Sequence, residues 1–403
     1  MNGKPFNNLR VAVVLLGTEG GGIRTFLLNQ QAHAADAGFD FQYVALQEGP
    51  MCAALRAGGA TISLLDAPLP YSKPSAPVAA VLRWLIPGRG FGRAHRSLHR
   101  HFTQKMPDCF YSHFLHTHLI CGVVGRKLGI PRIGHVHGTM NPRRWYGLTR
   151  LAYSCALARS VNRIIMVSRT AEDSLTAHVR RQARLVYNGI NVERIETAAA
   201  GVSKIPGKLI LLGRIVRGKK IDVAIRAMAA LMQSGVQCRL DVIGGPLDET
   251  NLYGLYLRRL VRDLKVDDRV AFTGPIHPPY ERLAAAEILV NCSTVEGLPY
   301  TIMESMLCRT PVIVADRGAP TEMVEHELAG LHFKADDPDS LAGAVARLLG
   351  DQGLRERLAE NALVYARRTF DISTHMRAIR AVFDETVSLR SCGGRAGTSP
   401  ASM

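Results

Sequence analysis

Short runs of consecutive apolar residues recur along the chain, and most of them end in glycine or in small polar residues. In the first half they are LRVAVVLLG (residues 9–17), FDFQYVAL, ATISLLD, DCFYSHF, RIGHVHG and RIIMVS. In the second half LILLGRI, RLDVIGG, RVAFTGP, AEILVNCS and PVIVADRG repeat the rhythm. Such runs are typical of strands that are buried on both faces of a parallel sheet. Stretches with helical spacing lie between them, such as TFLLNQQAHAADAG (residues 25–38), so the pattern predicts alternating strands and helices.

A segment poor in core residues, IETAAAGVSKIPGK (195–208), interrupts this alternation and predicts a linker between two domains. We therefore expect an α/β fold of two tandem Rossmann-like domains, over residues 1–195 and 205–370, with a cleft between them. A helix over 371–390 is expected to cross back to the N-terminal domain, and the Gly/Ser-rich residues 391–403 are expected to be a disordered tail. Parallel sheets of this kind bind ligands beyond the carboxyl ends of their strands, so the loops that follow strands are the places to search for chemistry.

Composition narrows the class of protein. The chain has 403 residues and 47% hydrophobic residues, which fits a globular protein with more than one core. No apolar run is long enough to span a bilayer, and the start MNGKPFNNLR has no cleavage-type signal. The eight cysteines include no C-x-x-C pair, which disfavours a zinc ribbon or a disulfide framework. A reduced, cytoplasmic protein is expected.

Positive charge is concentrated in the first half. Residues 1–200 carry 24 Lys and Arg against 10 Asp and Glu, whereas residues 201–403 carry 26 against 24. The segment FGRAHRSLHRHFTQK combines an apolar helical stripe with Arg93, Arg96 and Arg100. Either the stripe packs on its own sheet, or the helix takes part in attachment to an anionic membrane face or acceptor. Nucleic acid is not expected as a partner, because no recognition motif accompanies the charge.

The segment VEGLPYTIMESM (295–306) sets two carboxylates eight positions apart, with Pro299 between them. Proline suits the first position of a helix, which would leave Glu296 in the preceding loop and Glu304 in the second helical turn. A helix N-terminus favours a phosphate, and the two carboxylates would meet hydroxyl groups on either side of it. A solvated loop glutamate and an ordinary surface glutamate are the alternative.

Two other loops carry polar groups for an anionic ligand. GTEGGGIRTF follows the first strand, and its glycines allow a ligand to approach the backbone; a G-x-G-x-x-G dinucleotide fingerprint is absent, which disfavours NAD. LLGRIVRGKKID places Arg214 and Lys219 just beyond a strand. Two such cations could stabilise a diphosphate leaving group without a metal, although a basic surface loop has the same composition.

Taken together and in order, these segments resemble the retaining glycosyltransferases of family 4, which have the two-domain GT-B fold. In the first half, GGGIRTF is similar to the N-terminal glycine loop of that family, HVHG is similar to its T-x-H-G segment, and RIIMVSR and VYNGIN are similar to its VS and NG-[VI]-D elements. In the second half, GRIVRGKK is similar to its G-R-x-x-x-x-K-G phosphate clamp and AFTGPI to its base-contacting loop. VEGLPYTIMES is similar to its E-x(7)-E motif. The resemblance implies catalytic roles for Arg214, Lys219, Glu296 and His137, and donor contacts from Gly21, Gly22, Ile276, Gly297, Leu298, Pro299 and Glu304. In this assignment Glu296 faces the donor sugar, Glu304 faces the nucleotide ribose, and Pro299 offers only its carbonyl group.

Three positions depart from the pattern of that family: Asn191 replaces its usual Asp, and Lys220 and Arg309 replace glycines. The resemblance implies a retaining transfer of a hexosyl-type group from a nucleotide sugar, with UDP- or GDP-sugars as the expected donors. A saccharide or lipid-linked acceptor of the cell envelope is expected to approach from the N-terminal domain. A nucleotide-sugar epimerase of the same fold and an inactive nucleotide-sugar-binding scaffold are the alternatives.

A metal is not expected in this protein, and neither is a cofactor. The histidines 113, 116, 118, 135 and 137 lack a recognisable ligand spacing. We expect them to line the ends of strands. Asp337 and Asp339 form a D-x-D pair, which we expect to cap the helix that follows.

Overall fold

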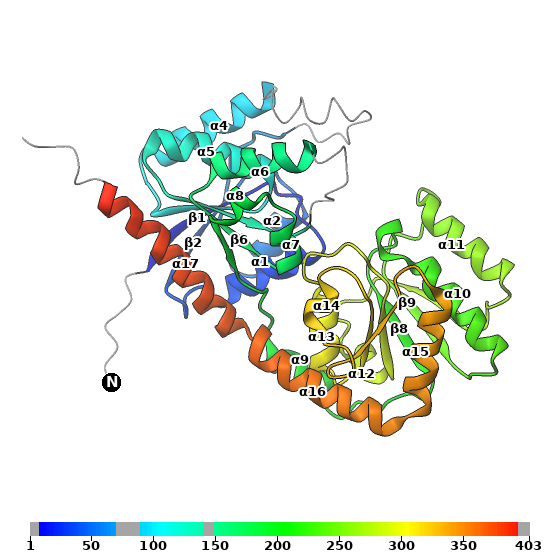
Figure 1. Cartoon of the computed structure of the whole chain (residues 1–403). Helices are drawn as coiled ribbons and strands as arrows, with labels where there is room; N and C mark the ends of the chain where they lie inside the picture. Colours follow the sequence, from blue (N-terminus) through cyan, green and yellow to red (C-terminus); the bar gives the residue numbers. More distant parts are fainter. Residues whose placement is uncertain (1–7, 70–88, 140–147, 394–403) are drawn as a thin grey trace, which may run out of the picture. The chain divides into compact units, whose positions relative to one another are not determined.

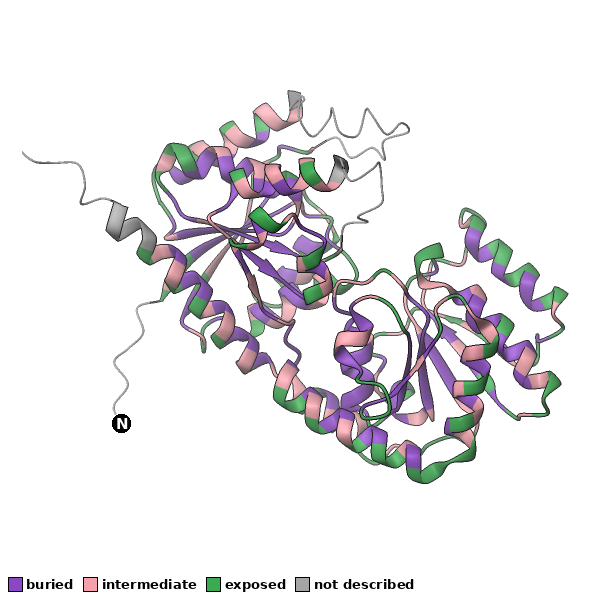
Figure 2. Ribbon diagram, viewed as in Figure 1, coloured by how far each residue is buried: buried purple, intermediate pink, exposed green. Residues whose placement is uncertain are grey.

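The computed structural model describes residues 8–69, 89–139 and 148–393, and the chain divides into two compact units (Figure 1). The first unit comprises Met1–Gly189 and Ile372–Met403, and the second comprises Ile190–Asp371. Each unit is an α/β layer structure built on one sheet, and the strands are buried in both (Figure 2). Among the described residues no helix is long and apolar enough to cross a membrane.

The first unit contains a seven-stranded sheet with the order β3-β2-β1-β4-β5-β6-β7, in which all neighbouring strands are parallel. Its strands are β1 (Leu9–Leu15), β2 (Phe39–Ala45), β3 (Ile62–Leu64), β4 (Cys109–Ser112), β5 (Arg132–Val136), β6 (Arg163–Met166) and β7 (Ala183–Leu185). The apolar runs read from the sequence therefore form strands. The central strands β1 and β4 are mostly buried, whereas β3 at the edge of the sheet is only partly buried.

Helices cover the sheet of the first unit. They are α1 (Gly22–Ala32), α2 (Pro50–Ala57), α4 (Arg89–Phe102), α5 (Leu115–Leu128), α6 (Leu148–Ser160), α7 (Arg169–Asp173), α8 (Ala177–Arg180) and α17 (Ile372–Gly393). The helices α4, α5 and α6 pack side by side, and α1 contacts α2 and α17. Glu385 of α17 pairs with Arg163 at the start of β6 and with Arg184 in β7, which fixes this last helix on the first unit.

The second unit contains a six-stranded parallel sheet with the order β10-β9-β8-β11-β12-β13. Its strands are β8 (Lys208–Leu212), β9 (Arg239–Ile243), β10 (Val270–Gly274), β11 (Ile288–Asn291), β12 (Val312–Ala315) and β13 (Leu331–Phe333). Its helical segments are α9 (Val192–Ala199), the short 3-10 helix η2 (Arg217–Lys219), α10 (Ile221–Gln233), α11 (Leu252–Asp263), α12 (Tyr280–Ala285), α13 (Tyr300–Leu307), α14 (Pro320–Met323), α15 (Pro338–Gly350) and α16 (Gln352–Phe370). A large apolar core lies between the sheet and α10, α11 and α15.

The expected linker at 195–208 is wrong, because the units divide between Gly189 and Ile190. Residues Val192–Ala199 form α9, which buries Ile195 completely within the second unit. Small alanines are compatible with a helix as well as with a flexible segment, and this pattern misled the prediction. Of the expected tail, residues 391–393 complete α17, and residues 394–403 lie outside the described part of the chain.

Strand order identifies where each sheet can bind a ligand. In the first sheet β1 lies between β2 and β4, and in the second β8 lies between β9 and β11. Chain connections run in opposite directions on either side of these positions. Such switch points leave a crevice at the carboxyl ends of the strands, where α/β proteins bind ligands. The loops after β1 and β4 and after β8 and β11 are therefore the candidate functional loops.

Candidate active site

The loops after β8 and β9 meet at a close backbone contact between two glycines. A Cβ atom on Gly244 would lie 1.8 Å from the carbonyl oxygen of Gly213, so the loops after β8 and β9 can approach only with glycine at this position. Arg214 follows directly and is exposed. Lys219 closes the short helix η2, and its side chain folds back over Gly213, where an added Cβ would lie 3.1 Å from its Cε.

Lys219 forms an ion pair with Glu296, which belongs to the loop after β11. Both side chains are mostly buried, with 18% and 16% of their surfaces exposed. The loops after β8 and β11 are the two loops at the switch point, which explains how residues separated by 77 positions meet. The structure thus brings together two of the four predicted catalytic residues, and Arg214 opens the same loop as Lys219.

Glu304 lies on α13 and is only 7% exposed. Burial raises the pKa of its carboxyl group from 4.5 to about 7. No side chain or backbone N–H of the described residues donates a hydrogen bond to it. The reading of Glu304 as an ordinary surface glutamate is wrong, because α13 packs on the sheet and on α16 and thereby buries the carboxyl group.

Pro299 was expected at the first helical position, but it precedes the helix. Its φ and ψ of −74° and 121° are extended, and α13 begins at Tyr300. Within the described ranges, no side chain caps this helix N-terminus. Leu298 and Pro299 are buried, and Gly297 is half-buried between them and Glu296. Ile276 follows β10 and is half-buried.

The three departures from the family pattern have local explanations. Lys220 and Arg309 both adopt left-handed backbone conformations, with φ of 52° and 53°, a region that favours glycine. Their side chains form ion pairs with Asp336 at 2.7 Å and with Glu360 at 3.3 Å. Asn191 caps α9 by accepting a hydrogen bond from the N–H of Arg194 at 2.9 Å, a role for which Asn and Asp are equally suited.

In the first unit, the glycine loop after β1 leads into α1. Gly21 is the N-cap of α1 with a φ of 59°, and Gly22 is its first residue. The loop also contains a residue that was not singled out from the sequence. Glu19 is buried and accepts hydrogen bonds from the N–H groups of Leu16 at 2.6 Å and Gly17 at 2.8 Å. A lone acidic residue inside a glycine-rich loop is the signal that could have indicated it.

A cluster of histidines lies at the neighbouring strand ends. His113 follows β4 and His137 follows β5, and Nδ1 of His113 lies 3.0 Å from Nε2 of His137. His135, within β5, stacks on His137 with ring centroids 4.3 Å apart and 11° between the planes. Tyr111 contacts Nδ1 of His135 through its hydroxyl group at 2.5 Å. The expectation that all five histidines line strand ends is correct only in part, because His116 and His118 lie on α5.

Burial controls the charge of this cluster. It lowers the pKa of His137 to about 3 and those of His113 and His135 well below the usual value, and the neighbouring histidines add to the effect. All three imidazoles are therefore neutral near pH 7. Neutral imidazoles can hold a metal, and one nitrogen of each ring lies within 4.8 Å of the others. The rings of His135 and His137 are nearly parallel, however, so their in-plane lone pairs do not converge on one point.

The expected capping role of Asp337 is confirmed. Its carboxylate accepts hydrogen bonds from the N–H groups of Asp339 and Ser340 at the start of α15.

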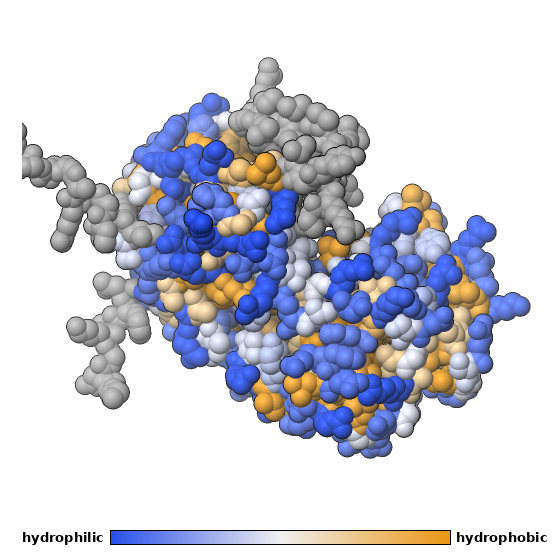
Figure 3. Space-filling model, in the orientation of Figure 1, coloured by the Kyte–Doolittle hydropathy of each residue, from blue (hydrophilic) through white to orange (hydrophobic). Residues whose placement is uncertain are grey.

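The apolar stripe of α4 is buried. Ala94, Leu98 and Phe102 belong to the core of the first unit. Arg93, Arg96 and Arg100 are exposed on the other side of the helix. The visible face of the first unit is largely hydrophilic (Figure 3). The stripe thus packs on its own unit, and only the arginines remain for an external partner.

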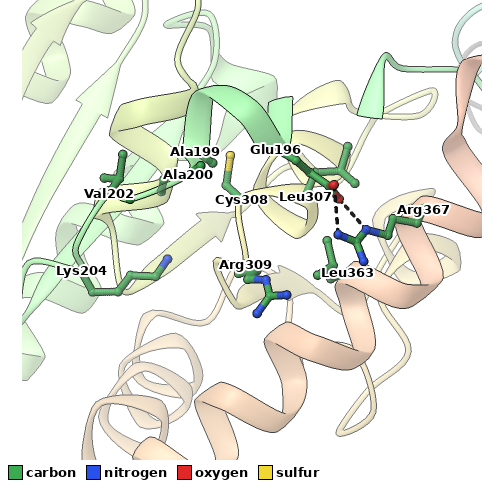
Figure 4. Close-up of a pocket in the computed structure, with 12 residues that line it drawn as sticks. Glu196, Ala199, Ala200, Val202, Lys204, Leu307, Cys308, Arg309, Leu363 and Arg367 are labelled. Atoms are coloured by element: carbon green, nitrogen blue, oxygen red, sulfur yellow. Dashed lines mark hydrogen bonds and ion pairs between the residues drawn. The ribbon is translucent and has the colours of Figure 1, made fainter. Parts of the chain in front are cut away.

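The second unit also has a pocket of about 420 Å³ away from these loops, between α9, α13 and α16 (Figure 4). Lys204, Arg309 and Arg367 line it. Arg367 pairs with Glu196 and Arg309 with Glu360, and the ammonium group of Lys204 donates to Ala286 and Thr310. The residues that line this pocket do not include the loops after β8 and β11, so it is not part of the crevice at the switch point of the sheet.

Comparison with known proteins identifies the family of the chain. Residues 20–194 match the family model "Glycosyltransferase Family 4", and residues 195–364 match "Glycosyl transferases group 1". The chain belongs to the GT-B glycosyltransferases. The predicted α/β fold with two Rossmann-like domains is thereby confirmed, and solved GT-B structures superpose on the chain.

Two curated relatives and one solved structure illustrate the likeness. A D-inositol 3-phosphate glycosyltransferase of Acidothermus cellulolyticus is 33% identical over 45% of this chain and 42% of its own length. The lipopolysaccharide core mannosyltransferase LpcC of Rhizobium leguminosarum bv. viciae is 27% identical over 58% of this chain and 67% of its own length. The structure of Anabaena HepE in complex with UDP-glucose superposes with a TM-score of 0.74 at 19% identity, covering 94% of this chain and all of HepE. The matched stretch is 42% of the Acidothermus protein and 51% of an uncharacterized glycosyltransferase, MJ1607, of Methanocaldococcus jannaschii, so the chain spans about half the length of these two relatives.

Proposed function

We propose that this chain is a retaining glycosyltransferase that moves a sugar from a nucleotide-sugar donor to a saccharide or lipid-linked acceptor, in the synthesis of a cell-envelope or exported polysaccharide. The observation that carries the proposal is the pairing of Lys219 with Glu296 at the switch point of the second sheet, with Arg214 in the same loop as Lys219. Among the related proteins, HepE has been solved with UDP-glucose and LpcC is a lipopolysaccharide core mannosyltransferase, which supports a nucleotide-sugar donor and an envelope acceptor.

In this mechanism the diphosphate takes the place of Glu296 as the partner of Lys219. Negative charge grows on the diphosphate as the sugar departs, and fixed cations in a partly dry site stabilise that charge most strongly. Arg214 can bind two phosphate oxygens through its planar guanidinium group. Glu296, released from the ion pair, can then accept hydrogen bonds from hydroxyl groups of the sugar. Because two cations are available, we propose that no metal takes part.

Glu304 is proposed to accept hydrogen bonds from the ribose hydroxyl groups of the nucleotide. Its buried carboxyl group has no donor among the described residues, so two hydroxyl donors would satisfy it. His137 is proposed to bind a hydroxyl group of the transferred sugar. These roles rest on the family resemblance together with the local contacts.

The proposal is tested by screening UDP-, GDP- and ADP-sugars for thermal stabilisation, because a ligand that binds the native state raises Tm. The stabilising donor is then assayed for transfer and for slow hydrolysis, with and without a chelator. Nuclear magnetic resonance of the product reports the anomeric configuration. Stabilisation without turnover would support a nucleotide-sugar-binding scaffold instead, and an inverted product or loss of activity with chelator would refute retention or metal independence.

We also propose that the exposed arginines of α4 attach the protein to an anionic membrane surface. The buried stripe leaves no apolar face for insertion, so the attachment would be electrostatic, at roughly 1 kcal/mol for each basic residue near the surface. The triple variant in which Arg93, Arg96 and Arg100 become Glu should lose co-sedimentation with anionic vesicles, and raised salt should weaken binding of the wild type.

A matched control changes the three exposed arginines of α11, Arg258, Arg259 and Arg262, to Glu. It alters the net charge equally but on the second unit. Equal losses in both triple variants would show that only net charge matters, and equal recovery of wild type with neutral vesicles would contradict an electrostatic attachment.

A further inference from the structure

His113 is the unassigned member of the histidine pair at the ends of β4 and β5. Its Nδ1 lies 3.0 Å from Nε2 of His137, and its ring is 4% exposed. Its second nitrogen, Nε2, is buried and has no hydrogen-bond partner among the described residues. The second nitrogen of His137, Nδ1, also has no hydrogen-bond partner in the described part of the chain, but the His137 ring is half-buried.

A hydrogen bond between two neutral imidazoles can be arranged in two ways. If His113 carried its proton on Nε2, this buried N–H would have no acceptor. If it carries the proton on Nδ1, that N–H is donated to Nε2 of His137, and the buried Nε2 of His113 is only an unused acceptor. Orphaned buried N–H groups are rarer in proteins than under-used acceptors, which favours the second arrangement.

We infer that His113 is a positioning residue that fixes the tautomer of His137, so that His137 presents a protonated Nδ1 as a hydrogen-bond donor to a hydroxyl oxygen of the donor sugar. The contact with the donor sugar rests on the proposed function, whereas the tautomer of His137 is a property of the free protein. The His137 ring stacks on His135 and makes an edge-to-face contact with Phe26, with ring centroids 4.7 Å apart. These two contacts hold the orientation of the His137 ring. Toward the sugar His137 is then only a donor, because its Nε2 accepts the hydrogen bond from His113, and it does not act as a general base near neutral pH.

The tautomer can be read directly in the free protein. Nitrogen-15 chemical shifts distinguish protonated from unprotonated imidazole nitrogens, and the variants His113→Phe and His137→Phe assign the two rings among the 14 histidines. In the wild type we expect His137 to carry its proton on Nδ1 and to accept at Nε2. In His113→Phe the His137 proton should move to Nε2, at least in part. A wild-type His137 protonated on Nε2 would overturn the inference, whatever the enzyme does.

Kinetic measurements with the nucleotide sugar that the thermal screen identifies show whether His113 affects catalysis through His137. His113→Phe should lower kcat/KM for the donor by about tenfold, as expected for one lost hydrogen bond. His137→Phe should lower it at least as much, and the double variant should lose no more than His137→Phe alone, because the two residues act through one contact. Independent, additive losses would refute the positioning role. If the wild type transfers no sugar at all, the proposed function fails, while the nitrogen-15 spectra still decide the tautomer.

Discussion

The buried carboxyl group of Glu304 makes stability depend on pH in a predictable direction. Burial raises its pKa from 4.5 in the unfolded chain to about 7 in the fold. At a pH below the pKa of the unfolded chain, the carboxyl group is protonated in both the folded and the unfolded state, so its ionisation does not change the free energy of unfolding. As pH rises, the unfolded chain ionises first, so the folded state loses stability until the pH exceeds the folded pKa. Linkage gives a cost of about 1.4 kcal/mol at about pH 5.5 and about 3 kcal/mol at about pH 8.

The substitution Glu304→Gln removes this cost, because an amide of nearly the same shape cannot ionise. The variant should exceed the wild type in the free energy of unfolding, and the difference should grow by about 2 kcal/mol between about pH 5.5 and about pH 8. Urea denaturation at both pH values measures it, with fluorescence and circular dichroism compared to detect separate unfolding of the two units. A pH-independent difference between the two proteins would refute the assignment of a raised pKa to Glu304.

Nucleotide binding should lower the raised pKa of Glu304. Two ribose hydroxyl groups that donate to Glu304 stabilise its ionised form, so binding of free UDP or GDP should release up to about one proton per site near neutral pH. Titration calorimetry in buffers of different ionisation enthalpy counts this proton. Glu304→Gln should release fewer protons than the wild type, because only the terminal phosphate of the nucleotide then loses a proton, and it should bind more weakly. Equal proton release and equal affinity in both proteins would show that the ribose is bound elsewhere.

Three further predictions follow from the second unit. Arg214→Ala and Lys219→Ala should each lower kcat by on the order of a hundredfold with the fold kept, as circular dichroism would show. Near-normal turnover in both would refute the diphosphate assignment. Glu296→Gln should bind free UDP or GDP more tightly, because Lys219 loses the carboxylate that competes with the diphosphate. In the same variant kcat for transfer should fall more than KM rises. Weaker binding of the free nucleotide would show that Glu296 does not compete with the diphosphate for Lys219. The variants Lys220→Gly and Arg309→Gly should each have a free energy of unfolding about 1 kcal/mol higher than the matched alanine variant in denaturant unfolding. Both substitutions remove the ion pair of Lys220 or Arg309, but only glycine relieves the left-handed backbone. An alanine variant as stable as the glycine variant would exclude backbone strain.

The sequence by itself determined the fold class and most of the elements. Runs such as LRVAVVLLG are apolar on both faces, and only a doubly covered parallel sheet buries such a strand, so the apolar pattern alone was enough to locate β1. The motif loops could be located for the same reason, because they follow these strands. Strands β7 and β13 were missed because each has only three residues, ARL and LHF, that stand out from no longer apolar run, whereas the equally short β3 was found within ATISLLD. The alanine-rich α9 was mistaken for a linker, because its burial depends on a surface that the sequence does not display.

Only the tertiary structure decided which of these residues meet. Strand order places the loops after β8 and β11 together, and this order, rather than any local pattern, pairs Lys219 with Glu296. The same holds for His113 and His137, which lie 24 positions apart and share a hydrogen bond because β4 and β5 are neighbours. Burial of Glu304 likewise depends on how α13 packs on the sheet and on α16. Local sequence fixes side-chain types and periodicity, whereas proximity, burial and therefore pKa arise from contacts between segments that are distant along the chain.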